Sequence, residues 1–263
     1  MFVVIKGAGD LASGVAVRLH RAGIQVTMTD LPFPTAIRRT VSFCPALVDG
    51  EAYVEGIRGV RVETAEEAFA AMERGEIAVI ADPDANIIKE MQPPVVVDAI
   101  LAKYNVNTKI TDAPVVIAMG PGFTAGEDCH AVIETMRGHS LGRVILEGAA
   151  MPNTGSPGVI CGCSDERILR APANGVFTAC RKIGDLVKKG EVMGMVGDAP
   201  MLAKIDGVLR GILTDGCEVF EGMKSGDIDP RGVVDHCYTV SDKARAIGGG
   251  VLEAILMLGG FLK

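Results

Sequence analysis

The stretch FVVIKGAGDLASGVAVRLHRAGIQVTMTD, from Phe2 to Asp30, decides the fold that this sequence predicts. Val3–Ile5 is a short apolar run, as expected of a strand that is buried on both faces. Apolar residues then recur at helical spacing from Leu11 to Leu19, and Val26–Met28 forms a second apolar run. The stretch therefore predicts a strand, a turn, a helix and a second strand in immediate succession.

The turn inside this stretch matches the pattern G-x-G-x-x-G/A of dinucleotide-binding proteins. Gly7 permits a tight turn, Gly9 allows the backbone to approach a pyrophosphate, and Ala12 lets the helix pack close to the strand. Asp10, which opens the helix, is counted with these ligand-binding residues. Asp30 ends the second strand, where a carboxylate can accept a hydrogen bond from a ribose hydroxyl. The sequence predicts NAD(P) here, and the alternatives are another anion or no ligand.

Two adjacent arginines, Arg38 and Arg39, follow the Leu31–Pro34 loop. Guanidinium groups bind phosphate well, so one hypothesis is that the pair clamps a phosphate of the ligand. The alternative is a solvated pair on a helix surface.

Further apolar runs alternate with helical segments along the first half of the chain. Ile77–Ile80, Val95–Val97 and Val115–Met119 are predicted to be buried strands, and Thr64 with Glu67 forms a capping box that opens a helix. This alternation predicts a Rossmann-like parallel sheet with helices on both faces.

A second glycine-rich loop follows the strand that ends at Met119. Gly120, Gly122 and Gly126 provide a backbone suited to holding an anion, and they are counted as ligand-binding residues. A binding site for a phosphorylated ligand is therefore predicted between the Gly7 and Gly120 loops.

Titratable side chains follow this loop in what the spacing predicts to be a helix. His130 and Glu134 would share one helix face, with Arg137 close behind. His130 is the candidate proton-transfer group, Glu134 would orient it, and Arg137 would bind a phosphate or oxyanion. The alternative is a surface Glu–Arg pair. The pattern shows no third ligand for a metal, so no metal site is predicted.

Composition restricts the classes of function. The chain has 263 residues, 48% of them hydrophobic, and a formal net charge of −7. This acidity argues against nucleic-acid binding. There is no apolar run of the ~18 residues that a membrane span requires, and no signal peptide is recognisable. Seven cysteines without framework spacing are typical of a reducing compartment, so a cytoplasmic location is expected.

Glycine and proline become dense between Met151 and Gly158, which predicts a linker between domains. Cys161 and Cys163 follow, one residue apart. Two such thiolates could hold a soft metal or form a redox pair. The chain has no second cysteine pair with metal spacing, and the role of these cysteines stays open.

An internal repeat follows the linker. Gly175, Gly184 and Gly190 recur 32 residues later as Gly207, Gly216 and Gly222. Regular glycines between short β-branched runs predict short strands joined by tight turns. Two similar halves of this kind resemble the small all-β sandwich-barrel hybrid of biotinyl and lipoyl domains. The hairpin that joins the halves, residues 197–201, contains no lysine, and Lys204 comes too late, so neither biotin nor lipoate is expected.

Three parts are predicted from these observations. Residues 1–147 form the Rossmann-like domain and residues 148–235 the β-rich module. Residues 236–263 form a final helix, capped by Ser241, that returns to the first domain. Glycines inside this helix indicate close packing against another backbone.

Several of these stretches together resemble the YqeB-type family of selenium-dependent molybdenum hydroxylase system proteins. They are residues 6–12, residues 38–43, the loop from Gly120 to Gly126 with its continuation to His139, and residues 171 onward. The resemblance implies an accessory protein, comparable to the XdhC-like proteins, that helps to mature a molybdenum hydroxylase. It also implies that enzyme as a partner and a nucleotide or a molybdopterin-type cofactor as the ligand.

Two other classes of function remain open at this point. One is an NAD(P)-dependent oxidoreductase, although the sequence contains no readable catalytic pair. The other is a non-enzymatic interaction scaffold. The sequence does not decide whether the protein is an enzyme, and it is compatible with a homo-oligomer that binds a small anionic ligand.

Overall fold

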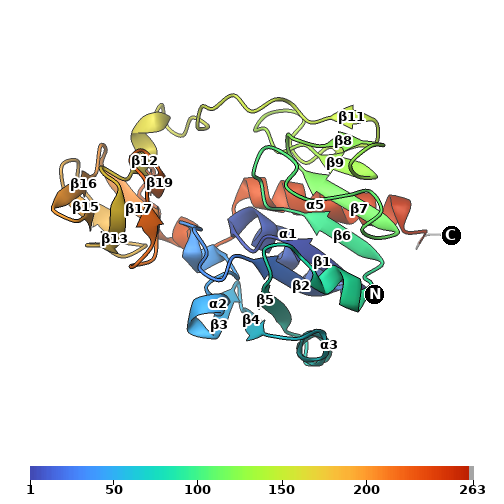
Figure 1. Ribbon diagram of the computed structural model, residues 1–263. Helices are drawn as coiled ribbons and strands as arrows, with labels where there is room; N and C mark the ends of the chain where they lie inside the picture. Colours follow the sequence, from blue (N-terminus) through green and yellow to red (C-terminus); the bar gives the residue numbers. More distant parts are fainter. Residues whose placement is uncertain (261–263) are drawn as a thin grey trace. The chain divides into compact units, whose positions relative to one another are not determined.

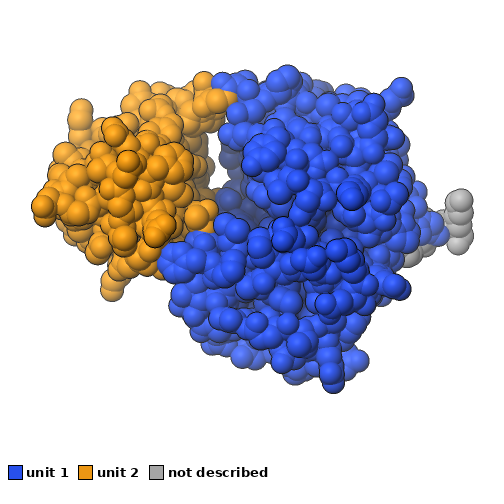
Figure 2. Space-filling model, in the orientation of Figure 1, with its two compact units in different colours: residues 1–34, 42–154, 240–263 blue, residues 35–41, 155–239 orange. Residues whose placement is uncertain are grey.

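The computed structural model describes residues 1–260 and divides the chain into two compact units (Figures 1 and 2). Unit 1 comprises residues 1–34, 42–154 and 240–263, and unit 2 comprises residues 35–41 and 155–239. A short segment around Arg38 therefore belongs with the second half of the chain. Among the described residues, no helix is long and apolar enough to cross a membrane.

Unit 1 is built on one large sheet of nine strands (Figure 1). The seven central strands are parallel, whereas both edge strands are antiparallel to their neighbours. In spatial order the strands are β10 (Val144–Ile145), β9 (Ala131–Ile133), β7 (Val115–Met119), β6 (Val95–Asp98), β1 (Phe2–Lys6), β2 (Gln25–Asp30), β5 (Ile77–Ala81), β4 (Ile57–Val62) and β3 (Glu51–Val54).

Helices cover this sheet, and the first and last of them pack on each other. The helices are α1 (Asp10–Arg21), α2 (Ala46–Asp49), α3 (Ala65–Glu73), α4 (Ile87–Met91) and α5 (Asp242–Leu258). A Cβ added at Gly14 of α1 would lie only 2.6 Å from the Cβ of Ala244 in α5, so the two helices meet through small residues. On α3, Ala68 and Met72 pack in one buried cluster with Val4 of β1.

Unit 2 consists of two four-stranded antiparallel sheets and includes residues 35–41. One sheet has the order β12 (Ile168–Arg170), β19 (Lys224–Asp229), β17 (Gly207–Ile212) and β14 (Leu186–Val187). The other has the order β16 (Ala199–Leu202), β15 (Val192–Val196), β13 (Gly175–Ala179) and β18 (Glu218–Val219). Their core contains Phe177, Met193 and Leu209. The 32-residue repeat is visible here, because β14 of the first half pairs with β17 of the second and β18 pairs with β13.

The remaining elements are short. β8 (Thr124–Ala125) and β11 (Gly148–Ala149) form a two-stranded sheet in unit 1. Three 3-10 helices complete the described chain: η1 (Arg39–Val41), η2 (Asp165–Arg167) and η3 (Val234–Cys237).

The fold class predicted from the sequence was wrong. The large sheet is mixed, in place of a Rossmann-like parallel sheet, and unit 2 is a pair of antiparallel sheets, in place of a biotinyl- or lipoyl-like barrel. One cause is the hairpin β3–β4, whose turn residues Glu55 and Gly56 have φ of 48° and 82°. Two positive φ angles are typical of the tight hairpin turn that joins antiparallel strands, and this signal was missed.

The helix predicted after Gly126 is also absent. Residues 131–133 instead form β9, which lies parallel to β7. Asp128 stabilises the turn before it, since its Oδ2 accepts a hydrogen bond from the backbone N–H of Thr124 at 2.8 Å. Ala131, Val132 and Ile133 are all buried, and a short buried run with β-branched residues is better suited to a strand than to a helix.

Lys204 is still expected to carry neither biotin nor lipoate. The tight turn between β15 and β16, at Gly197 and Asp198, contains no lysine. Lys204 lies outside this turn, and its Nζ forms an ion pair with Oδ2 of Asp165 at 3.9 Å. Intact mass spectrometry of the protein purified from cells that make both cofactors should show the unmodified mass. An adduct mapped to Lys204 would contradict this expectation.

Candidate functional site

The two glycines of the turn between β1 and α1 lie in different surroundings. Gly7 has a φ of 97°, and a Cβ added there would lie 2.9 Å from the carbonyl oxygen of Ala99. A Cβ added at Gly9, in contrast, would meet no atom within 4 Å. Gly7 is therefore required for packing within the protein, whereas Gly9 leaves open space at the start of α1.

Gly9 is the N-cap of α1 and, as a glycine, offers no side chain to cap this helix end. Ser13 fixes the turn from inside, because its hydroxyl donates to the carbonyl of Ala8 and accepts from the N–H of Phe43. Ala12 is buried at the third position of the motif. An uncapped helix N-terminus directs N–H groups and a partial positive charge outward, so the turn is suited to an anion.

Asp30 lies beside this turn, at the end of β2. Its carboxylate accepts hydrogen bonds from the backbone N–H groups of Ala8 and Leu31, both at 2.7 Å. Burial raises the pKa of Asp30, and these two hydrogen bonds oppose the rise. A carboxylate has about four acceptor positions, so Asp30 keeps the capacity to accept from a ligand hydroxyl.

A buried ion pair lies next to the glycine turn, where β1 and β6 end. Lys6 and Asp98 are register partners in these strands, and their side chains are 2% and 1% exposed with Nζ and Oδ2 3.8 Å apart. Thr108 donates its hydroxyl proton to Asp98, while Lys6 donates to Thr108 and Asn107. Burial lowers the pKa of Lys6, and the attraction of Asp98 opposes this effect.

This network anchors the irregular segment of residues 99–114 at the carboxyl edge of the sheet. Leu101 and Lys103 within it have φ of 61° and 69°, which is uncommon for residues other than glycine. Sequence analysis missed the network, although a usable signal existed. Lys6 and Asp98 each directly follow a run of apolar residues, and the carboxyl ends of neighbouring parallel strands meet at the same edge.

The three predicted catalytic residues do not form a group. His130 accepts a hydrogen bond on Nδ1 from the N–H of Val116 at 3.0 Å, so the neutral ring carries its proton on Nε2. Glu134 is buried and accepts from the N–H groups of Met136 and Met151, at 2.7 and 2.8 Å. Glu134 therefore fixes two loops, and no contact between it and His130 supports a proton-transfer pair.

The predicted arginines bind elsewhere in the protein. Arg137 forms a two-pronged pair with Asp242 at 2.7 and 3.0 Å on the surface of unit 1. Arg38 and Arg39 belong to unit 2, where they donate to the carbonyl oxygens of His236 and Ile212. Arg38 and Arg39 thus stabilise the packing of unit 2. They form neither the phosphate clamp nor the solvated surface pair that the sequence suggested.

The second glycine loop is tightly packed. A Cβ at Gly122 would lie 2.6 Å from the Cα of Tyr104, and one at Gly120 would lie 2.6 Å from the hydroxyl oxygen of Thr135. The N–H groups of Gly120 and Gly126 already donate to Ile133 and Cys129. Valine at Gly122 would therefore disturb the packing of this loop.

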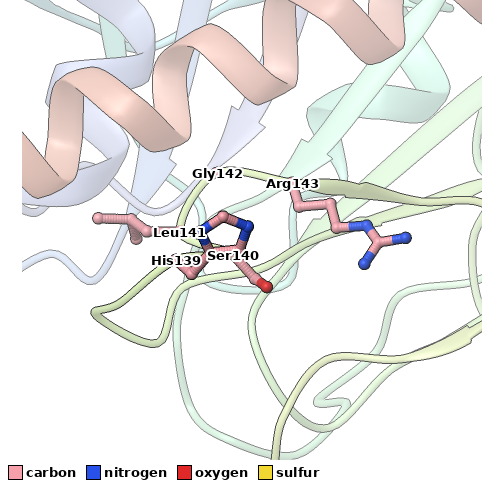
Figure 3. Close-up of a pocket in the computed structure, with 5 residues that line it drawn as sticks. All are labelled: His139, Ser140, Leu141, Gly142 and Arg143. Atoms are coloured by element: carbon pink, nitrogen blue, oxygen red, sulfur yellow. The ribbon is translucent and has the colours of Figure 1, made fainter.

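A depression of about 410 Å³ is lined by His139, Ser140, Leu141, Gly142 and Arg143 (Figure 3). All five residues come from the loop between β9 and β10. The side chain of Arg143 extends away from His139 and Ser140 in the close-up (Figure 3). These groups do not converge on a common point, which makes the depression a weaker candidate than the Gly9 turn. Within residues 1–260 no group of three or more His, Cys, Asp or Glu side chains could hold a metal ion.

No family model matches the chain, whereas a curated protein is similar to it. Over 256 residues it is 54% identical to the uncharacterized protein YqeB of Escherichia coli (strain K12). The alignment covers 97% of this chain and 47% of that protein, so the chain spans about half the length of its relative.

Similar solved structures are more distant. An aspartoacylase family protein from Mesorhizobium loti has a TM-score of 0.29 and 14% identity, covering 86% of this chain and 84% of that one. A succinylglutamate desuccinylase/aspartoacylase from Rhodobacter sphaeroides has a TM-score of 0.28 and 14% identity, with the same coverage. Likeness at this level transfers neither a fold nor an activity to the chain.

These comparisons correct the function that was predicted from the resemblance. The similar structures are named as aspartoacylase and desuccinylase proteins, and the curated relative is uncharacterized. None of these printed names supports the predicted role in maturing a molybdenum hydroxylase, and that prediction is withdrawn. The coarser part of the resemblance holds: over the length that the two proteins share, the chain is similar to YqeB.

Proposed function

We propose that this chain binds a small anionic ligand of the dinucleotide class, with NAD as the best match, at the turn between β1 and α1. The observation that carries the proposal is the open space at Gly9, the N-cap glycine of a 12-residue helix. A pyrophosphate there would accept from backbone N–H groups and meet the positive end of the helix dipole. No reaction is assigned to the ligand.

The position of the turn in the sheet supports the same site. β1 lies between β2 and β6, and the chain continues from β2 to one side of the sheet and from β6 to the other. In open sheets of parallel strands, ligands bind outside the carboxyl ends of the strands at such a reversal. Gly9 and Asp30 both lie at this edge of β1 and β2.

Asp30 favours NAD over NADP. Its carboxylate is held by two backbone N–H groups at the end of β2, where a ribose hydroxyl could donate to it. A 2′-phosphate at the same place would be repelled by this charge. Arg38 and Arg39, the first arginines after Asp30 in the sequence, donate hydrogen bonds to carbonyl groups of unit 2.

Calorimetric titration with NAD, NADP and inorganic phosphate tests the proposal. NAD is expected to bind more tightly than NADP, and Gly9→Val should abolish binding because its side chain fills the open space. The φ of Gly9 is −70°, which suits any residue, so the melting temperature should stay close to that of the wild type. Asp30→Asn should cost about 1–3 kcal/mol of NAD binding, which is a loss of affinity of roughly 5- to 150-fold. It should also reduce the ratio of the affinity for NAD to that for NADP.

Gly249→Ala serves as the matched control, since a Cβ at Gly249 also meets no atom within 4 Å but lies in α5. It should bind NAD as the wild type does. The proposal fails if neither dinucleotide binds to the wild type, or if Gly9→Val binds NAD with unchanged affinity.

A further inference from the structure

Cys161 and Cys163 lie in a tight hairpin turn of unit 2. The N–H of Ile160 donates to the carbonyl of Cys163 at 2.9 Å, and the N–H of Cys163 donates back at 3.0 Å. The two central residues, Cys161 and Gly162, have φ of 48° and 80°. A turn with two positive φ angles favours Asn-Gly or Asp-Gly, so Cys161 adopts a conformation that its own side chain disfavours.

The turn is held in place and its thiols reach solvent. The hydroxyl of Ser164 donates to the carbonyl of Pro157 at 2.8 Å, and Arg167 donates to the carbonyl of Gly158 at 3.1 Å. Arg167 is itself buried and paired with Asp227. Cys161 is exposed and Cys163 half-buried, whereas four of the other five cysteines are buried.

The spacing brings the two thiols within reach of each other. Two residues of extended chain span at most about 7 Å, and a turn shortens that span. A disulfide needs Cα atoms roughly 4.4–6.8 Å apart. Within the described residues no third His, Cys, Asp or Glu joins them to make a metal-binding group. The arrangement therefore favours a redox pair over a metal site.

We propose that Cys161 and Cys163 form a thiol–disulfide exchange site that acts on small disulfides of the glutathione class. The thiolate of the exposed Cys161 attacks one sulfur of the substrate disulfide and displaces the first thiolate. Cys163 then attacks the sulfur of Cys161, which closes the intramolecular disulfide and releases the second thiolate. Two electrons pass from the protein to the substrate, and the two protons of the cysteine thiols end on the released thiols. A dithiol reductant reverses the sequence.

The test uses the full chain, reduced and then incubated with glutathione disulfide, quenched by an alkylating agent and measured by intact mass. The wild type should lose two hydrogen atoms, and peptide mapping should locate the new bond between Cys161 and Cys163. Cys163→Ser should instead accumulate a stable glutathione adduct on Cys161, because the second step is blocked. Cys180→Ser is the matched control, since Cys180 is also exposed but has no neighbour at this spacing, and it should react as the wild type does.

Three outcomes would overturn the proposal. The first is independent glutathione adducts on both cysteines of the wild type without a bond between them. The second is a disulfide that links two chains. The third is binding of one Zn²⁺ or Cu⁺ per chain that is lost in Cys161→Ser and blocks oxidation by glutathione disulfide.

Discussion

Replacing Lys6 by methionine should lower the free energy of unfolding of unit 1 by about 3–5 kcal/mol. The carboxylate of Asp98 is 1% exposed, and its partner ammonium group lies 3.8 Å away. Methionine fills a similar volume but leaves this buried charge without its counter-ion. Thr108 and the N–H of Ile100 still donate to Asp98, and these two hydrogen bonds reduce the loss without removing it.

Urea unfolding measures the change, and hydrogen exchange with mass spectrometry locates it. Exchange should rise in the peptides that cover β1 and β6, whereas peptides from β13 and β17 of unit 2 should keep their protection. Lys89→Met is the matched control, because Lys89 is exposed on α4 and its ammonium group donates to the side chain of the likewise exposed Asn86. Its effect should stay within about 0.5 kcal/mol.

The double variant Lys6→Met/Asp98→Asn separates the buried charge from other causes. It should be more stable than Lys6→Met alone, since the uncompensated carboxylate is gone. Equal stability of the single and double variants would mean that lost packing, not the unpaired charge, causes the destabilisation.

Replacing Gly250 by alanine should lower the free energy of unfolding of unit 1 by ~3 kcal/mol or more. Overpacked sites typically cost ~1–3 kcal/mol, and this site lies at the upper end of that range. The new Cβ would lie 2.1 Å from the carbonyl oxygen of Gly142. The obstacle is backbone, which cannot rotate away as a flexible side chain can. Gly142 is itself confined, because a Cβ there would lie 2.6 Å from the carbonyl oxygen of Ala246. The helix must therefore move away from the loop between β9 and β10.

Gly249→Ala is the comparison within the same helix, one residue away. Its Cβ would enter open space, and alanine in a helix is favoured over glycine by up to ~1 kcal/mol. In thermal unfolding, Gly250→Ala should therefore lower the melting temperature. Gly249→Ala should raise it or leave it unchanged. A Gly250→Ala protein as stable as the wild type would show that α5 does not depend on this close approach.

Local patterns predicted several elements well. The strand β1, the glycine turn, α1 and β2 follow from apolar periodicity and from residues that are neighbours in the sequence. Thr64 caps α3 by accepting from the N–H of Glu67, and Ser241 caps α5 in the same way from Ala244, as the capping residues indicated. These features depend on interactions over a few residues, so one sequence contains the information for them.

The candidate site was less predictable. His130 and Glu134 do not share a helix, because a strand forms where the spacing indicated a helix. The carboxylate of Glu134 instead accepts hydrogen bonds from the N–H groups of Met136 and Met151. Arg38 and Arg39 bind carbonyl groups far along the chain. Each of these outcomes depends on partners that no local pattern specifies.

The sequence by itself determined the presence and the order of β1, α1 and β2, and it determined the turn that leaves Gly9 uncovered, because these are consequences of residue type and short-range sterics. Only the tertiary structure decided that Lys6 pairs with Asp98 and Thr108, that hairpin β3–β4 makes the sheet mixed, and that α5 packs on α1 through Gly14. Such contacts join residues distant in the chain, and they are chosen by burial and by the need to satisfy every buried polar group, which is a property of the whole fold.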